Sequence, residues 1–170
     1  SADFNWSASI SLYLKVLAEW EKYKEMLALQ LKSADPSLAE QLKVKIAYME
    51  ETEMAVIVSQ SQNEVDDFRK KGIDILPIRK RMQNDSLDEN FKKASHPLRI
   101  VFVCAMWITG FDVQSLSTIY LDKPMRNHTL MQTIARANRV FAGKSSGLIV
   151  DYVGVFRNLQ KALSTYAKPG

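Results

Sequence analysis

The sequence predicts an α/β protein: a parallel β-sheet with helices on both faces, preceded by an α-helical extension. Two observations carry this prediction. Residues 1–53 contain no β-like run, whereas residues 54–170 contain several short, continuous apolar runs. Helical segments lie between several of these runs, and strands that alternate with helices are typical of a parallel sheet buried on both faces. The chain is therefore divided into a helical extension or arm over 1–53 and a sheet-containing domain over 54–170.

Two helices are predicted in the extension. The first carries an apolar stripe at helical spacing, made of Leu12, Val16, Trp20, Tyr23 and Leu27. The pair Asp35-Pro36 is a helix-start signal, because aspartate caps a helix and proline is accepted at its first position. The second helix is expected from Pro36 to about Tyr48. Both helices are interpreted as packing on the main domain or on a neighbouring one.

Five apolar runs of the second part are interpreted as strands. They are "AVIVSQ" (55–60), "DILPIRK" (74–80), "RIVFVCAM" (99–106), "STIYLDK" (117–123) and "GLIVDYV" (147–153). Helices are expected at Glu64–Lys71 and Asn127–Asn138. Because ligands of open parallel sheets collect at the carboxyl ends of the strands, a site is expected at residues 59–62, 107–112 and 122–126.

Composition places the chain among soluble globular proteins, with 46% hydrophobic and 25% charged residues. No apolar run approaches the roughly 20 residues that span a bilayer, and nothing at the N-terminus resembles a signal peptide. A single cysteine cannot form an internal disulfide, which is typical of a reducing compartment. A soluble, cytoplasmic protein is therefore expected.

The net charge of +4 is unevenly distributed along the chain. Residues 1–53 carry nine acidic and six basic side chains, whereas residues 54–170 carry ten acidic and 17 basic ones. A basic excess indicates a polyanionic partner such as nucleic acid or nucleotide phosphates. The bases between Arg69 and Arg99 fit contact with a nucleic-acid backbone and a solvated surface equally well.

Two short patterns are set aside. Gly143-Lys144-Ser145 resembles the end of a phosphate-binding loop, but Asn138 stands where that loop needs glycine, and the segment runs from helix to strand instead of strand to helix. Cys104 lies within "VFVCAM", where cysteine is typical of a small buried hydrophobic residue and not of a nucleophile paired with His96 or His128. No His/Cys cluster has metal-ligand spacing, so no metal ligand is predicted.

The segment "QTIARANRV" (132–140) puts polar groups on one side of a helix. Gln132, Arg136 and Arg139 fall within a narrow arc at 3.6 residues per turn. The buried stripe of the same helix is expected to be Leu130, Ile134 and Ala137. Guanidinium groups meet phosphate with a rigid, permanently charged fork, and two of them on a γ-phosphate would stabilise the charge that grows during phosphoryl transfer. A surface helix with solvated arginines is the alternative.

The run "TGFDVQSLSTIYLDKPM…LMQTIARANRV" resembles the second motor domain of superfamily 2 helicases. Within that group it resembles most the restriction (R) subunit of type I restriction–modification enzymes. The residues that match its motifs are Gln132, Ala135, Arg136 and Arg139 for Q-x-x-G-R-x-x-R (alanine replacing glycine), Gly110-Phe111-Asp112 for G-x-D, and Asp122-Lys123-Pro124 for D-x-P. "AVIVSQSQ" resembles the motif that opens this domain. The resemblance covers residues from about 54 to 166.

This resemblance implies a RecA-like fold (a helicase C-terminal domain) that completes an ATP site whose ATP and Mg²⁺ are held by a first motor domain, N-terminal to this chain. By the same resemblance, Arg139 is the arginine finger on the γ-phosphate, and Arg136 supports the phosphates or the inter-domain contact. Gln132 helps to orient the γ-phosphate and the attacking water. Gly110 and Asp112 approach the nucleotide sugar.

The resemblance also implies DNA contacts from the loops after the strands, through Ser59, Ser61 and Thr109. The whole enzyme of such a family hydrolyses ATP to translocate double-stranded DNA before cleaving it, in a bacterial or archaeal cytoplasm. Its partners are the modification and specificity subunits, the first motor domain and DNA. The nuclease centre has no match here, so this chain alone is expected to be inactive.

Three alternatives stay open at this point. The chain could belong to another superfamily 2 helicase or translocase, or be a nucleic-acid-binding module that keeps the fold without ATP turnover. A hydrolase that uses Cys104 is the third.

Overall fold

A computed structural model of the chain describes residues 6–104, 107, 112–125, 127–137, 144, 146–157 and 160. The chain divides into two compact units, residues 1–106 and 107–170. The predicted division at residue 53 falls between the last helix of the extension, which ends at Glu51, and the first strand, which begins at Glu53. Helices and strands on either side of that point belong to the same compact unit.

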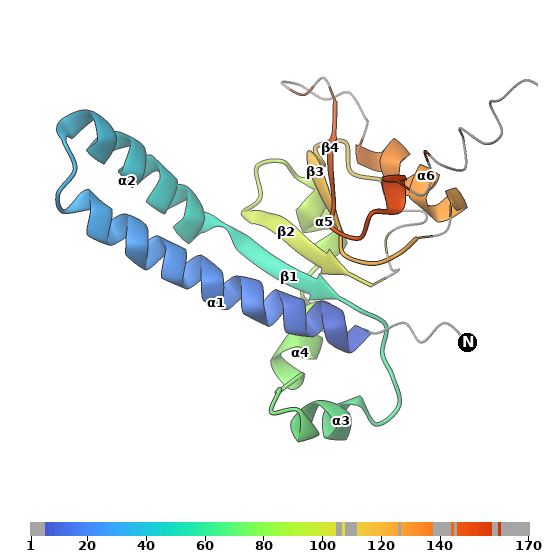
Figure 1. Cartoon of the computed structure of the whole chain (residues 1–170). Coiled ribbons are helices and arrows are strands. Elements are labelled where there is room, and N and C mark those ends of the chain that lie inside the picture. Colours follow the sequence, from blue (N-terminus) through green and yellow to red (C-terminus); the bar gives the residue numbers. More distant parts are fainter. Residues whose placement is uncertain are drawn as a thin grey trace, which may run out of the picture. The chain divides into compact units, whose positions relative to one another are not determined.

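The first unit begins with two helices, α1 (Trp6–Leu31) and α2 (Pro36–Glu51), which lie side by side as a hairpin (Figure 1). Leu27, Leu42 and Met49 are the buried residues between them. The indole nitrogen Nε1 of Trp20 donates a hydrogen bond to the carbonyl oxygen of Met49, at 3.1 Å. The predicted helices are confirmed, and the second extends one turn beyond Tyr48.

The start of α2 follows the predicted capping chemistry. Asp35 has an extended backbone, and its Oδ1 accepts hydrogen bonds from the backbone N–H groups of Ser37 and Leu38, at 2.9 and 3.0 Å. These N–H groups have no partner within a helix, so the carboxylate satisfies them. Pro36 takes the first position, where its missing N–H costs nothing.

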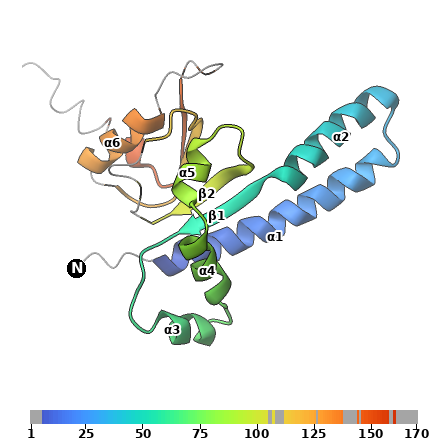
Figure 2. The ribbon, with the colours of Figure 1, turned by 180° about the vertical axis from the view of Figure 1, so that it is seen from behind.

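Two parallel strands follow, β1 (Glu53–Ile57) and β2 (Leu98–Val103), with Ala55 opposite Val101. Between them lie the helices α3 (Glu64–Lys70), α4 (Leu76–Asn84) and α5 (Leu87–Lys92). Helix α4 contacts β1, and α5 contacts β2. Both helices lie at the front in Figure 2. From α1, the ring of Tyr13 meets that of Phe102 edge to face at 5.5 Å. The core of this part consists of Ile10, Val56, Val58, Phe68, Ile75 and Cys104.

The strand predicted at residues 74–80 is wrong, because this segment begins α4. Oδ1 of Asp74 accepts a hydrogen bond from the N–H of Leu76 at 3.0 Å, and Pro77 lies in the first turn of the helix. Ile75 is 1% exposed, and Ile78 packs against the same cluster. A spacing of three residues places both on one side of a helix, whereas a strand would turn them to opposite faces.

The second unit is built around a strand–helix–strand segment. Strands β3 (Thr118–Leu121) and β4 (Leu148–Asp151) are parallel, with Tyr120 opposite Val150, and α6 (Asn127–Ala137) lies between them in sequence. Its buried residues are Leu121, Leu130 and Val155, with Ile119, Met125, Ile134, Ile149 and Phe156 packed against them. The start of β4 passes so close to the end of α6 that a Cβ at Gly147 would overlap the carbonyl group of Ala137.

Four of the five predicted strands are confirmed, and their parallel pairing confirms the α/β class. In the part of the chain that the structure describes, the strands form two sheets of two strands each, β1-β2 and β3-β4. The RecA-like arrangement therefore stays a prediction. Among the same residues, no helix is both long and apolar enough to cross a membrane.

Candidate functional site

A polar loop follows β1 at its carboxyl end. Residues 54–58 are all buried, and the chain reaches the surface at Ser59 and Gln60, which are exposed. Asn63 ends the loop with a φ of 59°, a left-handed conformation in which asparagine is enriched, and α3 begins at the next residue. The loop of residues 59–62 thus combines two hydroxyl groups and two amides at an edge of the parallel pair.

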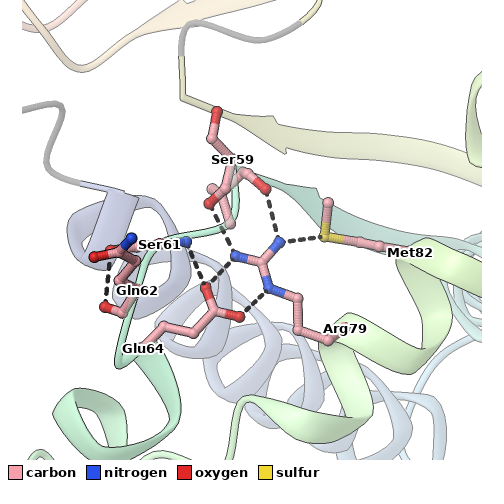
Figure 3. Close-up of polar contacts among 7 residues, drawn as sticks. Ser59, Ser61, Gln62, Glu64, Arg79 and Met82 are labelled. Carbon is pink, nitrogen blue, oxygen red and sulfur yellow. Dashed lines mark hydrogen bonds and ion pairs between the residues drawn. The ribbon is translucent and has the colours of Figure 1, made fainter.

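Arg79 of α4 holds this loop from the inside (Figure 3). Its Nη1 donates to the carbonyl oxygen of Val58 at 2.8 Å, and its Nη2 donates to that of Ser59 at 2.9 Å. The guanidinium also forms a two-pronged ion pair with Glu64, Nε to Oε1 at 2.7 Å and Nη2 to Oε2 at 2.6 Å. Glu64 itself accepts from the N–H of Ser61 at 3.1 Å. The backbone groups of Val58, Ser59 and Ser61 are therefore linked to one ion pair.

The ion pair is largely removed from water, since the side chains of Arg79 and Glu64 are 11% and 6% exposed. Burial by itself raises the pKa of the Glu64 carboxyl. The hydrogen bonds from Arg79 and from the Ser61 N–H, together with the positive charge of Arg79, outweigh burial and hold the pKa below its ordinary value. Glu64 is therefore ionised at neutral pH, and its charge is compensated.

The two serines for which DNA contacts are predicted both lie in this loop. Ser59 is exposed, and Ser61 is half-buried with its hydroxyl donating to the carbonyl oxygen of Gln62 at 3.2 Å. Thr109, the third predicted DNA contact, lies outside the described residues. The structure brings Ser59 and Ser61 together with Gln60 and Gln62.

Helix α6 carries the predicted nucleotide-site residues. The predicted buried stripe is confirmed: Leu130 and Ala137 are buried and Ile134 packs on the same cluster. Gln132 and Arg136 are half-buried and lie one turn apart, outside that stripe. Arg139 and Gly110 lie outside the described residues, and Asp112 is exposed.

Thr133 is a polar residue of this helix that is buried, at 4% exposure. Its hydroxyl donates to the carbonyl oxygen of Thr129, one turn earlier, at 2.8 Å. This bond satisfies the hydroxyl within the helix and lets Thr133 face the core beside Leu130. The rotation of α6 about its own axis is thereby defined by buried residues on one side.

The two patterns set aside from sequence have structural roles. Lys144 donates through Nζ to the carbonyl oxygen of Leu116 at 2.5 Å, so it ties together two loops of the second unit. Cys104 is buried among apolar side chains, which confirms the core interpretation. Among the described residues, no group of three histidine, cysteine or acidic side chains is arranged to hold a metal ion.

The arginines between residues 69 and 99 are largely structural. Arg81 donates to the Met54 carbonyl oxygen at 2.7 Å and pairs with Glu53, and Arg99 pairs with Glu51. Together with Arg79, they bind carboxylates and backbone of their own unit. The charge counts agree: residues 1–106 carry 15 basic and 16 acidic side chains, and residues 107–170 carry eight basic and three acidic ones. The basic excess thus belongs to the second unit.

Sequence reasoning missed three residues. Arg79 stood in a run interpreted as a strand, and Glu64 was placed only as the start of a helix, so their contact could not be foreseen. Asp151, at the end of β4, accepts hydrogen bonds from the N–H groups of Val153 and Phe156, at 3.1 and 2.9 Å. These bonds, that of Phe156 first, lower the pKa of the Asp151 carboxyl. The signal for Asp151 was a carboxylate among the apolar residues of the run 147–153, three residues before Gly154.

Parallel strand pairs with intervening helices, and a polar loop at the end of β1, define an α/β protein with its candidate site at the strand ends. The family model that describes domain 3 of the type I restriction enzyme subunit R matches residues 12–154. The chain belongs to this family. The resemblance to the R subunit that was seen in the sequence is therefore confirmed.

Curated relatives agree. The chain is 50% identical over 92 residues to the type I restriction enzyme HindI endonuclease subunit of Haemophilus influenzae, covering 52% of this chain and 9% of the relative. It is 50% identical over 90 residues to the putative MjaIXP endonuclease subunit of Methanocaldococcus jannaschii, covering 53% and 9%. To the putative MjaVIIIP subunit of that organism it is 33% identical over 140 residues, covering 76% and 13%. The chain thus spans between 9% and 13% of the length of these relatives. No solved structure matches it.

Proposed function

We propose that this chain is the part of a type I restriction R subunit that completes the ATP site of a DNA translocase. In this proposal, α6 and the residues after it supply Arg136 and Arg139 to a triphosphate. A preceding first motor domain holds most of the ATP and Mg²⁺. The loop of residues 59–62 contacts the backbone of double-stranded DNA.

The observation that carries the proposal is the orientation of α6. Leu130, Thr133 and Ala137 are buried on one side, so Gln132 and Arg136 project from another side of the same helix. The rotation of the helix is set by its apolar contacts, so the backbone positions of Gln132 and Arg136 stay on one side of the helix without a ligand. Preorganised groups of this kind are effective where charge develops in a transition state.

The chemistry of the side chains fits phosphoryl transfer. A guanidinium group keeps its charge at every physiological pH and can bind two phosphate oxygens at once. Arg139 is three residues beyond Arg136, and we propose that it contacts the γ-phosphate while Gln132 orients the attacking water. Asp112 is exposed and carries the acceptor that a ribose hydroxyl needs.

The proposal for the loop has separate support. Ser59, Gln60 and Gln62 are exposed, and such hydroxyls and amides are common partners of phosphate oxygens in DNA complexes. Among the described residues, one acidic side chain, that of Glu64, forms a hydrogen bond with the loop backbone. Its charge is already compensated by Arg79.

The test is the ATPase rate of the intact R subunit with DNA. Arg139→Ala should lower turnover by about 10³-fold or more, the usual scale for an arginine finger, while nucleotide binding and folding persist. Arg139→Lys should restore little, because a single ammonium cannot replace the fork. The matched control is Arg69→Ala, which removes an exposed arginine of the first unit that is paired with Asp66. Near-normal turnover in the Arg139→Ala variant would leave α6 as an ordinary surface helix.

A further inference from the structure

We infer that Arg79 and Glu64 are positioning residues for DNA binding: their buried ion pair fixes the backbone of residues 58–61 so that the loop of residues 59–62 can meet a phosphate backbone. This inference rests on the proposed DNA contact of that loop. It assigns a role to two side chains that do not themselves face a ligand.

Arg79 has no donor left for a phosphate. A guanidinium carries five N–H groups. Those of Arg79 make five contacts, with Oε1 and Oε2 of Glu64, with the carbonyl oxygens of Val58 and Ser59, and with the sulfur of Met82 at 3.5 Å. The group is also mostly buried. Its contacts are therefore directed to the protein, and its effect on DNA must pass through the loop.

The polar groups of the loop backbone point toward the ion pair. The carbonyl groups of two consecutive residues, Val58 and Ser59, point to the same guanidinium, and the N–H of Ser61 points to the carboxylate paired with it. These polar groups therefore face inward. Figure 3 shows the hydroxyl of Ser59 on the side away from the guanidinium. The ion pair thus separates an inward-facing backbone from outward-facing side chains.

Regular secondary structure does not restrain the loop. Strand β1 ends at Ile57 and α3 begins at Glu64, so the intervening residues have no ladder or helix to hold them. Bringing flexible groups to a phosphate costs conformational entropy on binding. A loop that is ordered before binding avoids much of this cost, and Arg79 with Glu64 supplies that order from two different helices.

The experiment uses this chain, with a short DNA duplex of mixed sequence as the probe. The main variant is the double replacement Glu64→Leu/Arg79→Met. It removes one negative and one positive charge, so the net charge is unchanged. Replacing a buried ion pair by apolar side chains of similar size is often neutral or stabilising, so this variant is expected to fold. The matched control is Asp66→Asn/Arg69→Gln, which removes a solvent-exposed pair of α3 that does not contact the loop.

The expected result is a three- to tenfold loss of affinity, about the effect of one or two lost hydrogen bonds. The dependence of affinity on salt should stay the same, because Arg79 does not bind a phosphate. Hydrogen exchange of the Ser61 amide should accelerate at the same time. The control pair should leave all three quantities unchanged.

A separate variant, Ser59→Ala/Ser61→Ala, distinguishes failure of the inference from failure of the proposed function. If the serine variant binds less tightly but Glu64→Leu/Arg79→Met binds like the unmodified chain, the ion pair is not a positioning device. If the serine variant binds normally, the two serines do not contact DNA, and the proposed DNA contact through them falls together with the inference. A salt dependence that drops by about one counterion when Arg79 is replaced would show direct phosphate contact and would overturn the inference.

Should the apolar double variant not fold, Arg79→Lys replaces it. Lysine keeps the charge but cannot bind two carbonyls and a carboxylate with one planar group. Faster exchange of the Ser61 amide together with weaker DNA binding supports the inference. Unchanged binding despite faster exchange overturns it.

Discussion

Arginine serves different ends in the two compact units. In the first unit, Arg79, Arg81 and Arg99 each combine a carboxylate with hydrogen bonds to backbone or hydroxyl groups of that unit. Acidic and basic side chains are almost equal in number there. In the second unit, bases outnumber acids by eight to three, and Arg136 lies on α6 away from the buried stripe. The excess of bases that would suit a polyanionic partner is therefore confined to the second unit, where acids do not match them.

The largest expected contrast is in stability. Arg79→Ala leaves Glu64 buried without its counter-charge, and breaking a buried pair in this way costs about 3 to 5 kcal/mol. Arg157→Ala, at an exposed arginine of the second unit, should change the free energy of unfolding by less than about 0.5 kcal/mol, as surface substitutions usually do. Chemical denaturation of both variants measures the difference. Equal effects would remove the distinction between buried and exposed arginines.

The next largest effect is a loss of stability caused by steric overlap in the second unit. Gly147→Ala forces a methyl group against the carbonyl of Ala137, and overpacking of this kind costs about 1 to 3 kcal/mol. The matched change in the first unit is Gly72→Ala, where no atom lies near the new methyl group and only the positive φ of 71° is strained. That strain is about 1 kcal/mol. Thermal unfolding of the two variants should rank them in this order, and the reverse order would mean that β4 can move away from α6.

The two units can also be compared by how their stability depends on acidic pH. The pKa of Glu64 is lowered in the folded protein, so its contribution to stability is complete above the ordinary glutamate value of about 4.3 and is lost as the pH falls through the lowered value. Unfolding free energies should thus be flat from neutral pH to about pH 5 and decline below it. Glu64→Gln should reduce that decline, whereas Asp66→Asn, at an exposed pair, should not.

Asp151 should produce a parallel decline in the second unit, since hydrogen bonds from the backbone lower its pKa in the same direction. Asp151→Asn tests this. If the unfolding free energy of Glu64→Gln and of Asp151→Asn declines at low pH as it does in the unmodified chain, other groups cause the acid unfolding.

The smallest effect is the contribution of single charges to DNA binding. The chain should bind duplex DNA weakly, without sequence preference and with strong dependence on salt. Arg157→Gln in the second unit should reduce the slope of log affinity against log salt by about one. Arg69→Gln in the first unit should leave it unchanged, because Arg69 is paired with Asp66 at 3.3 Å. A larger effect from Arg69 would mean that exposed bases of the first unit contribute more to the salt dependence of DNA binding than those of the second unit.

Local signals in the sequence were sufficient where the structure depends on neighbours in the chain. Asp35-Pro36 begins α2 as predicted, and the stripe Leu130, Ile134 and Ala137 is the buried side of α6. The same kind of signal was overlooked at Asp74 and Pro77, because the apolar residues around them were taken for a strand. Helical spacing of Ile75 and Ile78 would have distinguished the two.

The candidate site was harder to predict because it depends on distant residues. Arg79 and Glu64 are 15 residues apart and lie on two helices, so their contact follows from the packing of α3 and α4 and not from any motif. Ser59 and Ser61 could be assigned to a strand end from sequence, but what holds them could not. Likewise, the pattern of apolar runs predicted parallel strands without showing which strands pair.

The close approach of Gly147 to Ala137 limits how α6 can move. One end of the helix abuts the start of β4, and Leu130 lies within the cluster that also contains Leu121 and Val155. Rotation by a single residue position, about 100°, would expose Leu130 and drive polar groups into the core. Rotation of α6 is thus blocked by its buried side. A displacement of β4 that keeps these contacts would move α6, and with it Gln132 and Arg136, as one rigid piece.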